Sequence, residues 1–406
     1  MASVAVLGYG TVGSGVVEVL QKNADEITRK SGVRIDVKYI LDIREFPGDP
    51  NENAIVHDFA VIESDPEVKV VAEAMGGLHP AYDFTRRALE AGKSVCTSNK
   101  ELVAEFGTEL TQIAAQHGVS YLYEASCGGG IPIIRPLRNA LTADVITGLS
   151  GIFNGTTNFI LTRMEKEGHD YADVLAEAQA MGYAERNPAA DVEGYDTCRK
   201  LAILASLAYG VQISYKDIRT EGITKVTAAD IAYASFLQYK IKLLGISRRS
   251  GDRVEAVVLP AMIGCDTPLY AVDDVFNAIL VRGNMLDDVM FYGKGAGKLP
   301  TGSAVASDVI EAVVSGGKCG ILPQGEPAVP VDPETMSYRF FVRIPENTDA
   351  TQEKVSAVFE DASLINLEEY PQESAFVTGV MTEKEFTEKV AGLGSVTGWI
   401  RILPAE

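Results

Sequence analysis

The sequence predicts an α/β protein that begins with a doubly wound parallel sheet and continues into an α+β domain and a small C-terminal domain. Three observations lead to this fold class. Short apolar segments alternate with amphipathic segments over residues 1–126, a glycine-rich turn follows the first apolar segment, and a proline-rich stretch precedes a final β-α-β-β-α-β pattern. Strands that alternate with helices are typical of a parallel sheet with helices on both faces.

Composition excludes several classes of protein. The chain has 406 residues, 46% of them apolar, which is enough for two or three domains with sizeable cores. A net charge of −20 argues against nucleic acid or an anionic membrane as the main partner, because both need a basic face. There is no basic leader, and no apolar run is long enough to span a bilayer. The five cysteines (Cys319 among them) and four histidines lack disulfide or zinc-ligand spacing, so we expect a cytoplasmic protein.

The first predicted strand, residues 3–8, leads into GYGTVG, which places Gly8, Gly10 and Gly13 in G-x-G-x-x-G spacing before a helix that extends to Gly32. This strand, turn and helix are the context of a dinucleotide-binding Rossmann turn. The first glycine allows the tight turn, the second lets backbone approach a pyrophosphate, and the third lets the helix pack on the strand. The residues expected to bind the cofactor here are Gly8, Gly10, Thr11, Val12 and Gly13.

The second predicted strand ends at Asp42. An acid at this point can accept both ribose hydroxyls, which favours NAD. Arg44 can instead pair with a 2′-phosphate, which favours NADP. The two signals conflict, and both cofactors stay open.

Further strands at 68–77, 94–100 and 119–126 alternate with helices at 81–92 and 101–118. Ligands of such a sheet bind at the carboxyl ends of its strands. The residues that fall at these ends include Gly76, Ser98 and Lys100. A lysine at a helix start is unfavourable for the helix dipole, so we expect Lys100 to face the cofactor's reactive ring.

The stretch from Gly182 to Lys200 is rich in charged residues and leads into an apolar run. Asp196 and Lys200 are four residues apart, which places a carboxylate and an ammonium on one helix face. A half-desolvated lysine held by an aspartate is suited to donate and accept a proton. The alternative is a surface ion pair at the start of a helix.

With these residues in place, the chain resembles homoserine dehydrogenase over nearly its whole length. The segments that carry the resemblance are GYGTVG (8–13), SNKELVA (98–104), EASCGGGIPII (124–134), SGIFNGTTNFIL (150–161), the 182–210 segment and GAGKLPTGSAVASDVI (295–310). The family interconverts aspartate 4-semialdehyde and homoserine with NAD or NADP, in threonine and methionine biosynthesis.

The resemblance implies roles for single residues. Lys200 is implied to be the general acid and base, with Asp196 as its partner and Lys100 beside nicotinamide and substrate. Glu185 and Asp191 are implied to bind the substrate's amino group. Gly182 and Tyr183 are expected beside these two acids, and Gly302 is expected to close over the cofactor.

A monovalent-cation site, usually sodium, is also implied. Its residues are expected to be Glu124 with the backbone of Cys127, Gly129 and Ile131. The chain departs from the family pattern where Leu41 replaces a common arginine before Asp42, which weakens the NADP interpretation.

The predicted domains are a dinucleotide-binding domain at 1–135 completed by 300–320, a substrate-binding and dimerisation domain at 136–300, a linker at 321–336, and a ferredoxin-like domain at 337–406. Strands and helices mix in the second domain, and its open sheet is expected to form a homodimer or homotetramer. Asn154 is expected to cap a helix or to line the site; both remain open.

The last domain resembles an ACT domain, a frequent appendage of this family that binds an amino acid, here expected to be threonine. PENTDATQEKV replaces the usual ligand-binding turn, so a purely structural role is an equal alternative. Two rival functions are a catalytically silent nucleotide-binding regulator and a dehydrogenase of another short amino-aldehyde.

Overall fold

The computed structural model describes residues 1–317, 325–360 and 362–403, and its contacts divide the chain into two units. The first unit comprises 1–147, 199–215 and 282–328, and the second comprises 148–198, 216–281 and 329–406. Part of the predicted linker at 321–336 and Cys319 lie outside the described residues. None of the helices described is both long and apolar enough to cross a membrane.

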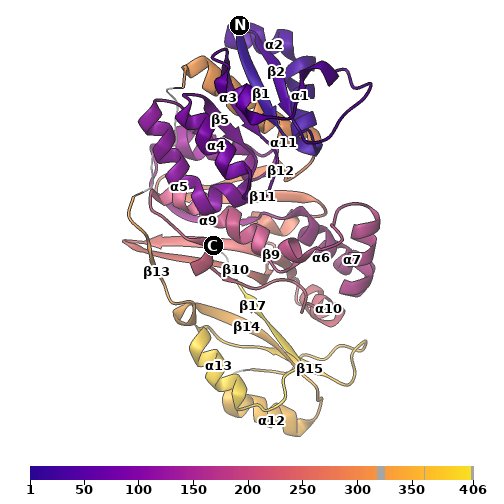
Figure 1. The fold of residues 1–406 in the computed structure, drawn as a ribbon. Helices are drawn as coiled ribbons and strands as arrows, with labels where there is room; N and C mark the ends of the chain where they lie inside the picture. The colour runs from indigo at the N-terminus through magenta and orange to yellow at the C-terminus, as the bar shows by residue number, and fades with distance from the viewer. Residues whose placement is uncertain (318–324, 361, 404–406) are drawn as a thin grey trace. The chain divides into compact units, whose positions relative to one another are not determined.

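The first unit is built on a six-stranded parallel sheet with the order β3-β2-β1-β4-β5-β6. The chain leaves the central strand in one direction for β2 and β3 and returns to its other side for β4, β5 and β6, which is the doubly wound arrangement. Helices cover both faces of this sheet (Figure 1). Its strands are β1 (Ala2–Leu7), β2 (Ile35–Leu41), β3 (Ile55–Val56), β4 (Val68–Glu73), β5 (Ser94–Thr97) and β6 (Tyr121–Leu122).

The helices of this unit are α1 (Thr11–Lys22), α2 (Ala24–Ser31), α3 (Phe59–Ser64), α4 (Ala81–Glu90), α5 (Lys100–His117) and α11 (Lys298–Ser315). The helix predicted to run to Gly32 breaks at Asn23, which ends α1 and begins α2. The strand predicted at 119–126 is correct only for β6, because Glu124–Ser126 forms a 3-10 turn.

Helix α11 returns from late in the sequence to pack against α1. A Cβ atom on Gly302 would lie 2.6 Å from the carbonyl carbon of Gly15, and one on Gly15 would lie 2.2 Å from the carbonyl oxygen of Lys298. Only glycines allow the two helix backbones to approach so closely. Val305 and Val309 of α11 then join the buried core of the sheet.

The second unit is built on a mixed sheet in which the order of its strands is β11-β7-β9-β10-β17-β14-β15. β9 and β10 form a long antiparallel hairpin, and β17 pairs parallel to β10. The strands are β7 (Ile146–Ile152), β9 (Lys240–Ser250), β10 (Arg253–Ile263), β11 (Phe276–Gly283), β14 (Ser337–Ile344), β15 (Ser374–Val377) and β17 (Gly398–Ile402).

The helices of this unit are α6 (Gly155–Glu167), α7 (Tyr171–Ala180), α8 (Ala189–Val192), α10 (Ala228–Phe236), α12 (Asp349–Val358) and α13 (Glu383–Ala391). Helix α9 (Tyr195–Tyr209) begins in the second unit and continues into the first. The remaining strands of the chain are β8 (Arg219–Thr220), β12 (Asp287–Lys294), β13 (Val329–Pro330) and β16 (Met381–Thr382). Short 3-10 or π turns occupy Glu52–Ala54, Pro136–Ala140, Tyr215–Asp217, Pro268–Ala271 and Pro333–Thr335.

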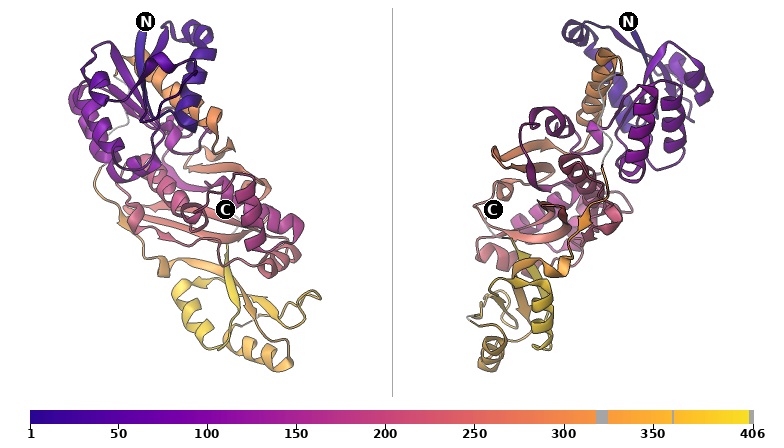
Figure 2. Two further views of the ribbon diagram at one scale, coloured as in Figure 1. Left: turned by 45° about the vertical axis from the view of Figure 1, so that its right-hand side comes forward. Right: turned by 90° about the vertical axis from the view of Figure 1, so that its left-hand side faces the viewer.

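The segment from β14 to β17 follows the predicted β-α-β-β-α-β order with one correction. Residues 367–370, which have the length and composition of a short strand, form a turn instead, closed by a hydrogen bond from the Tyr370 N–H to the Leu367 carbonyl. The pairing that remains is a single bridge between Ile365 and Ala375. Figure 2 shows α12 and α13 beside these strands. The segment shares one buried core with β9 and β10, in which Phe340 and Phe376 pack with Leu259.

Candidate active site

The glycine turn after β1 has the geometry that its spacing predicts. Gly8 adopts φ +88°, a conformation that favours glycine. A Cβ atom on Gly13 would lie 1.8 Å from the Gly8 carbonyl oxygen, so the start of α1 rests directly on the turn. A Cβ atom on Gly10 would meet nothing within 4 Å, which leaves this backbone open to a ligand. A pyrophosphate can therefore reach the first turn of α1.

The two residues that gave conflicting cofactor signals bind each other. Arg44 donates from Nε and Nη2 to the two oxygens of Asp42, at 2.9 Å each. The Tyr9 N–H also donates to Asp42, at 2.8 Å. These hydrogen bonds, led by that from Arg44, hold the pKa of Asp42 well below its usual range. The carboxylate is buried, whereas the Arg44 side chain is 58% exposed, so the guanidinium is the partner that can move.

A buried carboxylate links the carboxyl ends of β4 and β5. Glu73 accepts hydrogen bonds from the Thr97 hydroxyl and from the Met75 N–H. Burial raises the pKa of Glu73. The Asn99 N–H donates to the Thr97 hydroxyl, at 2.9 Å, and the Asn99 Oδ1 caps α5 at Leu102. This network fixes the backbone on either side of Ser98 and immediately before Lys100.

Gly76 and Ser98 lie beside this network. Gly76 adopts φ +86°, and a Cβ atom there would meet nothing within 4 Å. The Ser98 N–H donates to the Glu73 carbonyl at 3.3 Å. Lys100 is the first residue of α5 and is half-buried. Gly302, in contrast, is buried against α1.

In the second unit, Asn154 joins two of the implied site acids. Its Nδ2 donates to Asp191 at 2.7 Å and to Asp196 at 2.9 Å. Its Oδ1 accepts from the Thr157 N–H at 2.9 Å and so caps α6. Asn154 thus caps α6, and it also contacts two of the acids that the resemblance implies; whether it lines the site stays a prediction. An amide is suited to this position because it presents a donor and an acceptor on one group.

The remaining site residues implied for the acidic segment, residues 182–200, do not share the contacts of Asn154. The Thr156 hydroxyl, at the start of α6, donates to the Tyr183 carbonyl at 2.7 Å. Glu185 is exposed, and among the described residues no side-chain hydrogen bond or ion pair joins it to Asp191. Gly182, which precedes Glu185 in the chain, adopts φ +76°. The structure therefore groups Asp191 with Asp196 and leaves Glu185 on the surface.

Helix α9 carries Asp196 in its first turn and Lys200 one turn later. The Lys200 side chain is only 7% exposed, so it does not lie in bulk solvent. Asp196 is 2% exposed. Burial of this kind excludes a simple surface ion pair at the helix start.

The loop expected to hold a cation begins at Glu124, whose carboxylate is buried. The carboxylate accepts hydrogen bonds from three backbone N–H groups, those of Ile133 at 2.6 Å, Ile134 at 2.8 Å and Arg135 at 2.7 Å. A cation here would therefore be held by backbone carbonyls. Those of Gly129 and Ile131 accept no hydrogen bond within the described ranges, which fits a hard cation. The described residues contain no cluster of three acidic, histidine or cysteine ligands.

Asp308 of α11 binds both ends of this loop, a contact that no local pattern in the sequence indicated. Its Oδ2 accepts from the Glu124 N–H at 2.8 Å, and its Oδ1 accepts from Arg135 at 2.7 Å. Burial and the neighbouring charge of Glu124 raise the pKa of Asp308 to about 8.

An open glycine turn on a doubly wound sheet, together with a buried lysine among acids, defines the class of nicotinamide-dependent dehydrogenases. The "Homoserine dehydrogenase, NAD binding domain" family model matches residues 8–124, and the "Homoserine dehydrogenase" model matches residues 132–310. The chain belongs to the homoserine dehydrogenase family, and it is an NAD(P)-dependent oxidoreductase.

Individual relatives agree with this assignment. A homoserine dehydrogenase of Pseudomonas aeruginosa is 43% identical over 311 residues, which cover 76% of this chain and 72% of that protein. The crystal structure of a homoserine dehydrogenase from Thiobacillus denitrificans superposes with a TM-score of 0.92 at 34% identity and covers 100% of this chain and 99% of its own. A hyperthermophilic archaeal homoserine dehydrogenase in complex with NADPH has a TM-score of 0.67 at 26% identity, over 77% of this chain and 98% of its own.

Proposed function

We propose that Lys200 is the general acid and base in the interconversion of L-aspartate 4-semialdehyde and L-homoserine. The observation that carries the proposal is the burial of Lys200 one turn after Asp196 on α9. A bound nicotinamide cofactor supplies or takes up the hydride. In the reducing direction Lys200 gives its proton to the aldehyde oxygen, and in the oxidising direction it takes the proton of the hydroxyl.

The acids around Asn154 orient the reaction. Asp196 stabilises the ammonium of Lys200, and Asp191 binds the substrate's amino group. Glu185 adds a second carboxylate for that amino group when substrate is present. Lys100 adds positive potential where the oxygen becomes negative, which stabilises the transition state in a site closed to water. Gly182 and Tyr183 line the substrate-binding site from the turn that precedes Glu185.

On cofactor choice, we propose that Arg44 permits NADP to bind beside NAD. The positive charge of Arg44 offsets that of the Asp42 carboxylate, so the acid repels a 2′-phosphate less than an unpaired acid would. The Arg44 side chain is 58% exposed, so the guanidinium can turn from Asp42 toward a 2′-phosphate. The remaining cofactor contacts of the proposal are Gly8, Gly10, Thr11, Val12, Gly13, Gly76, Ser98 and Gly302.

Four further assignments stay predictions from the sequence. A monovalent cation, most simply sodium, is held by the backbone of Cys127, Gly129 and Ile131 beside Glu124. The enzyme is cytoplasmic and forms a homodimer or homotetramer. The ACT-like segment either binds threonine or has a purely structural role. Activity with sodium or potassium as the sole cation tests the cation, sedimentation of the purified protein tests the oligomeric state, and inhibition by added threonine tests the ACT-like segment.

The acid/base assignment is tested with Lys200→Ala, and Lys30→Ala on the exposed face of α2 is the control. We expect kcat for homoserine oxidation to fall about 10²- to 10⁴-fold while NAD and NADP still bind with unchanged Kd. The lysine-dependent limb of the kcat–pH profile should disappear. Near-normal turnover in this variant would refute the assignment.

A further inference from the structure

Tyr9 stands between the first two glycines of the dinucleotide-binding turn, and its side chain binds the loop that follows β2. The Tyr9 hydroxyl donates to the Asp49 carboxylate at 3.2 Å and accepts from the Asn51 Nδ2 at 3.0 Å. The Tyr9 ring meets the Phe46 ring edge-on, with the ring centres 5.0 Å apart. We call residues 43–54 the ribose loop, because a Rossmann sheet binds the adenosine ribose at the end of its second strand.

The ribose loop is fixed at more than one point. The Asn51 N–H donates to the Asp49 carboxylate at 2.8 Å, and the Asn51 Oδ1 accepts from Gln21 of α1 at 2.6 Å. The Tyr9 N–H donates to Asp42, the acid that precedes the loop. The position of the loop relative to the glycine turn is therefore set by side chains that the dinucleotide-binding motif does not specify.

Within the ribose loop, Phe46 contacts Arg44. The guanidinium carbon of Arg44 lies over the Phe46 ring, 5.0 Å from its centre, which is within the range of a cation–π contact. A guanidinium that lies over a ring keeps the N–H groups of its edge available, so it can bind a carboxylate or a phosphate without leaving the ring. The ring can therefore hold the guanidinium both when it binds Asp42 and when it turns toward a 2′-phosphate.

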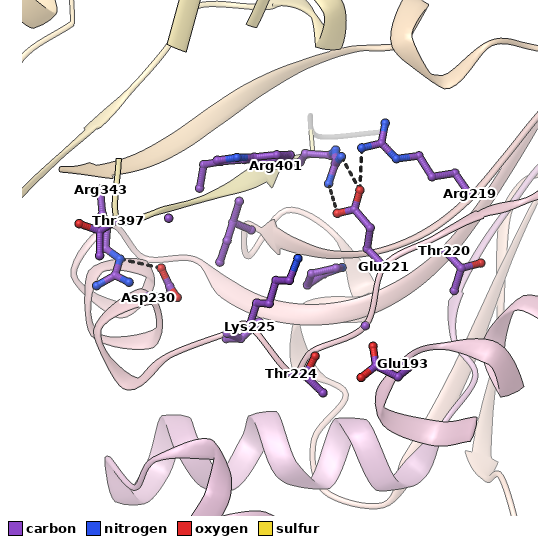
Figure 3. A pocket seen from close by; sticks show the side chains of 16 residues that line it. Glu193, Arg219, Thr220, Glu221, Thr224, Lys225, Asp230, Arg343, Thr397 and Arg401 are labelled. Atoms are coloured by element: carbon purple, nitrogen blue, oxygen red, sulfur yellow. Dashed lines mark hydrogen bonds and ion pairs between the residues drawn. The ribbon is translucent and has the colours of Figure 1, made fainter. Parts of the chain in front are cut away.

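A buried arginine with similar partners shows why the exposure of Arg44 matters. In the second unit, the Arg401 guanidinium also lies over a ring, 4.7 Å from the centre of Trp399, and pairs with the carboxylate of Glu221 (Figure 3). Only 1% of the Arg401 side chain is exposed, so its guanidinium stays with its carboxylates. The Arg44 side chain is 58% exposed and can exchange one anion for another.

We propose that Tyr9 and Phe46 are positioning residues for the choice of cofactor. Tyr9 holds Phe46 beside the glycine turn, and Phe46 holds the Arg44 guanidinium where it can exchange Asp42 for a 2′-phosphate. The inference rests on the proposed role of Arg44 in NADP binding. NAD carries a hydroxyl at the 2′ position and does not need the cation, so the loss of either positioning residue should weaken NADP and leave NAD unchanged.

The test compares kcat/KM for NADP and for NAD at saturating homoserine in the full-length enzyme. Tyr9→Phe removes the hydroxyl and keeps the ring, Phe46→Leu removes the ring, and Phe46→Tyr keeps it. Tyr39→Phe is the matched control, because the Tyr39 hydroxyl also donates to a carboxylate, that of Asp65 at 3.0 Å, outside the ribose loop. We expect the NADP-to-NAD ratio to fall about threefold to fivefold in Tyr9→Phe and Phe46→Leu, as fits a cation–π contact at an exposed site, and to stay unchanged in the other two variants.

Repeating both changes in an Arg44→Ala background separates the outcomes. The ratio should not change further there, because Tyr9 and Phe46 act through the guanidinium. If Arg44→Ala alters the ratio but Tyr9→Phe and Phe46→Leu do not, this inference alone is overturned. If Arg44→Ala leaves the ratio unchanged, the proposed role of Arg44 is overturned as well.

Two other results would also overturn the inference. Equal losses with NADP and NAD in Tyr9→Phe and Phe46→Leu would show that these contacts only support the fold. A ratio that still changes in the Arg44→Ala background would show that the two residues act by a route other than the guanidinium.

Discussion

Asn154→Asp separates the two roles of the asparagine at the start of α6. The change keeps an oxygen that accepts from Thr157, and aspartate is as good a helix cap as asparagine. It removes the donor to Asp191 and Asp196 and places a third carboxylate between them. Capping is thus preserved while the bridge between the two acids is lost.

The expected cost follows from those two hydrogen bonds. A hydrogen bond to a charged group contributes about 1.5–3 kcal/mol, and Asn154 is 5% exposed, so little solvent screening reduces it. We expect the free energy of unfolding to fall by about 3 kcal/mol at pH 8, or roughly 6 °C in the unfolding midpoint. Because Asp191 and Asp196 lose their common partner, kcat/KM for homoserine should fall about 100-fold.

The loss should also depend on pH. Three neighbouring carboxylates raise the pKa of one of them above its unfolded value. Such a group contributes stability at low pH that is lost as pH rises through its folded pKa, so the deficit should be smaller at pH 5.5 than at pH 8.

Differential scanning calorimetry at both pH values measures this, and Asn99→Asp is the control. Asn99 also caps a helix, but its Nδ2 donates to the neutral Gly77 carbonyl, at 2.6 Å, so its loss should be about 1 kcal/mol. A midpoint deficit in Asn154→Asp that equals that of Asn99→Asp, or that does not change with pH, would show that Asn154 only caps α6.

Three further outcomes follow. Arg44→Ala should lower kcat/KM for NADP at least about tenfold relative to NAD, because the cation is lost and Asp42 is freed for ribose; steady-state rates with each cofactor measure the ratio. Asp308→Asn should flatten the pH dependence of stability: with its pKa raised to about 8, Asp308 stabilises the fold below pH 4, and this is lost as pH rises to about 8. Urea denaturation measures the free energy of unfolding across that pH range, and the same pH dependence in wild type and variant would contradict this. Glu185→Gln should raise the KM for homoserine about tenfold and leave cofactor Kd unchanged; an unchanged KM would remove Glu185 from substrate binding.

Local patterns in the sequence were sufficient to predict the dinucleotide-binding turn. G-x-G-x-x-G spacing specifies a backbone path within six residues, and the approach of Gly13 to Gly8 in the structure is the contact that such a path needs. The periodicity of the helices likewise predicted their positions. It missed the break at Asn23 because apolar residues continue at helical spacing on both sides of it.

The pairing of Asp42 with Arg44 shows a limit of a different kind. Each residue was identified as a cofactor contact, and each signal was sound in isolation. Their separation of two residues let them bind each other, which neither cofactor motif describes. A motif assigns a residue type to a position but does not say whether a neighbour competes for its hydrogen bonds.

Long-range partners were beyond the sequence altogether. Asn154 is 37 residues from Asp191, and Asp308 is 184 residues from Glu124. Nothing in the spacing of a single chain encodes such pairs, because they depend on how α6 and α11 pack after folding.

The same reasoning explains why the C-terminal segment looked separable. A proline-rich stretch and a complete β-α-β-β-α-β order are typical of an independent domain. Yet β17 pairs with β10, and Arg401 of β17 is buried against Glu221. A buried arginine that loses its partners costs about 3–5 kcal/mol, so this contact is not a loose tether. Glu221 precedes Gly222, whose backbone packs against Val192 and Glu193. A displacement of β17 would therefore also displace the backbone next to Asp191. The C-terminal segment is better regarded as part of the substrate-binding unit than as an appendage.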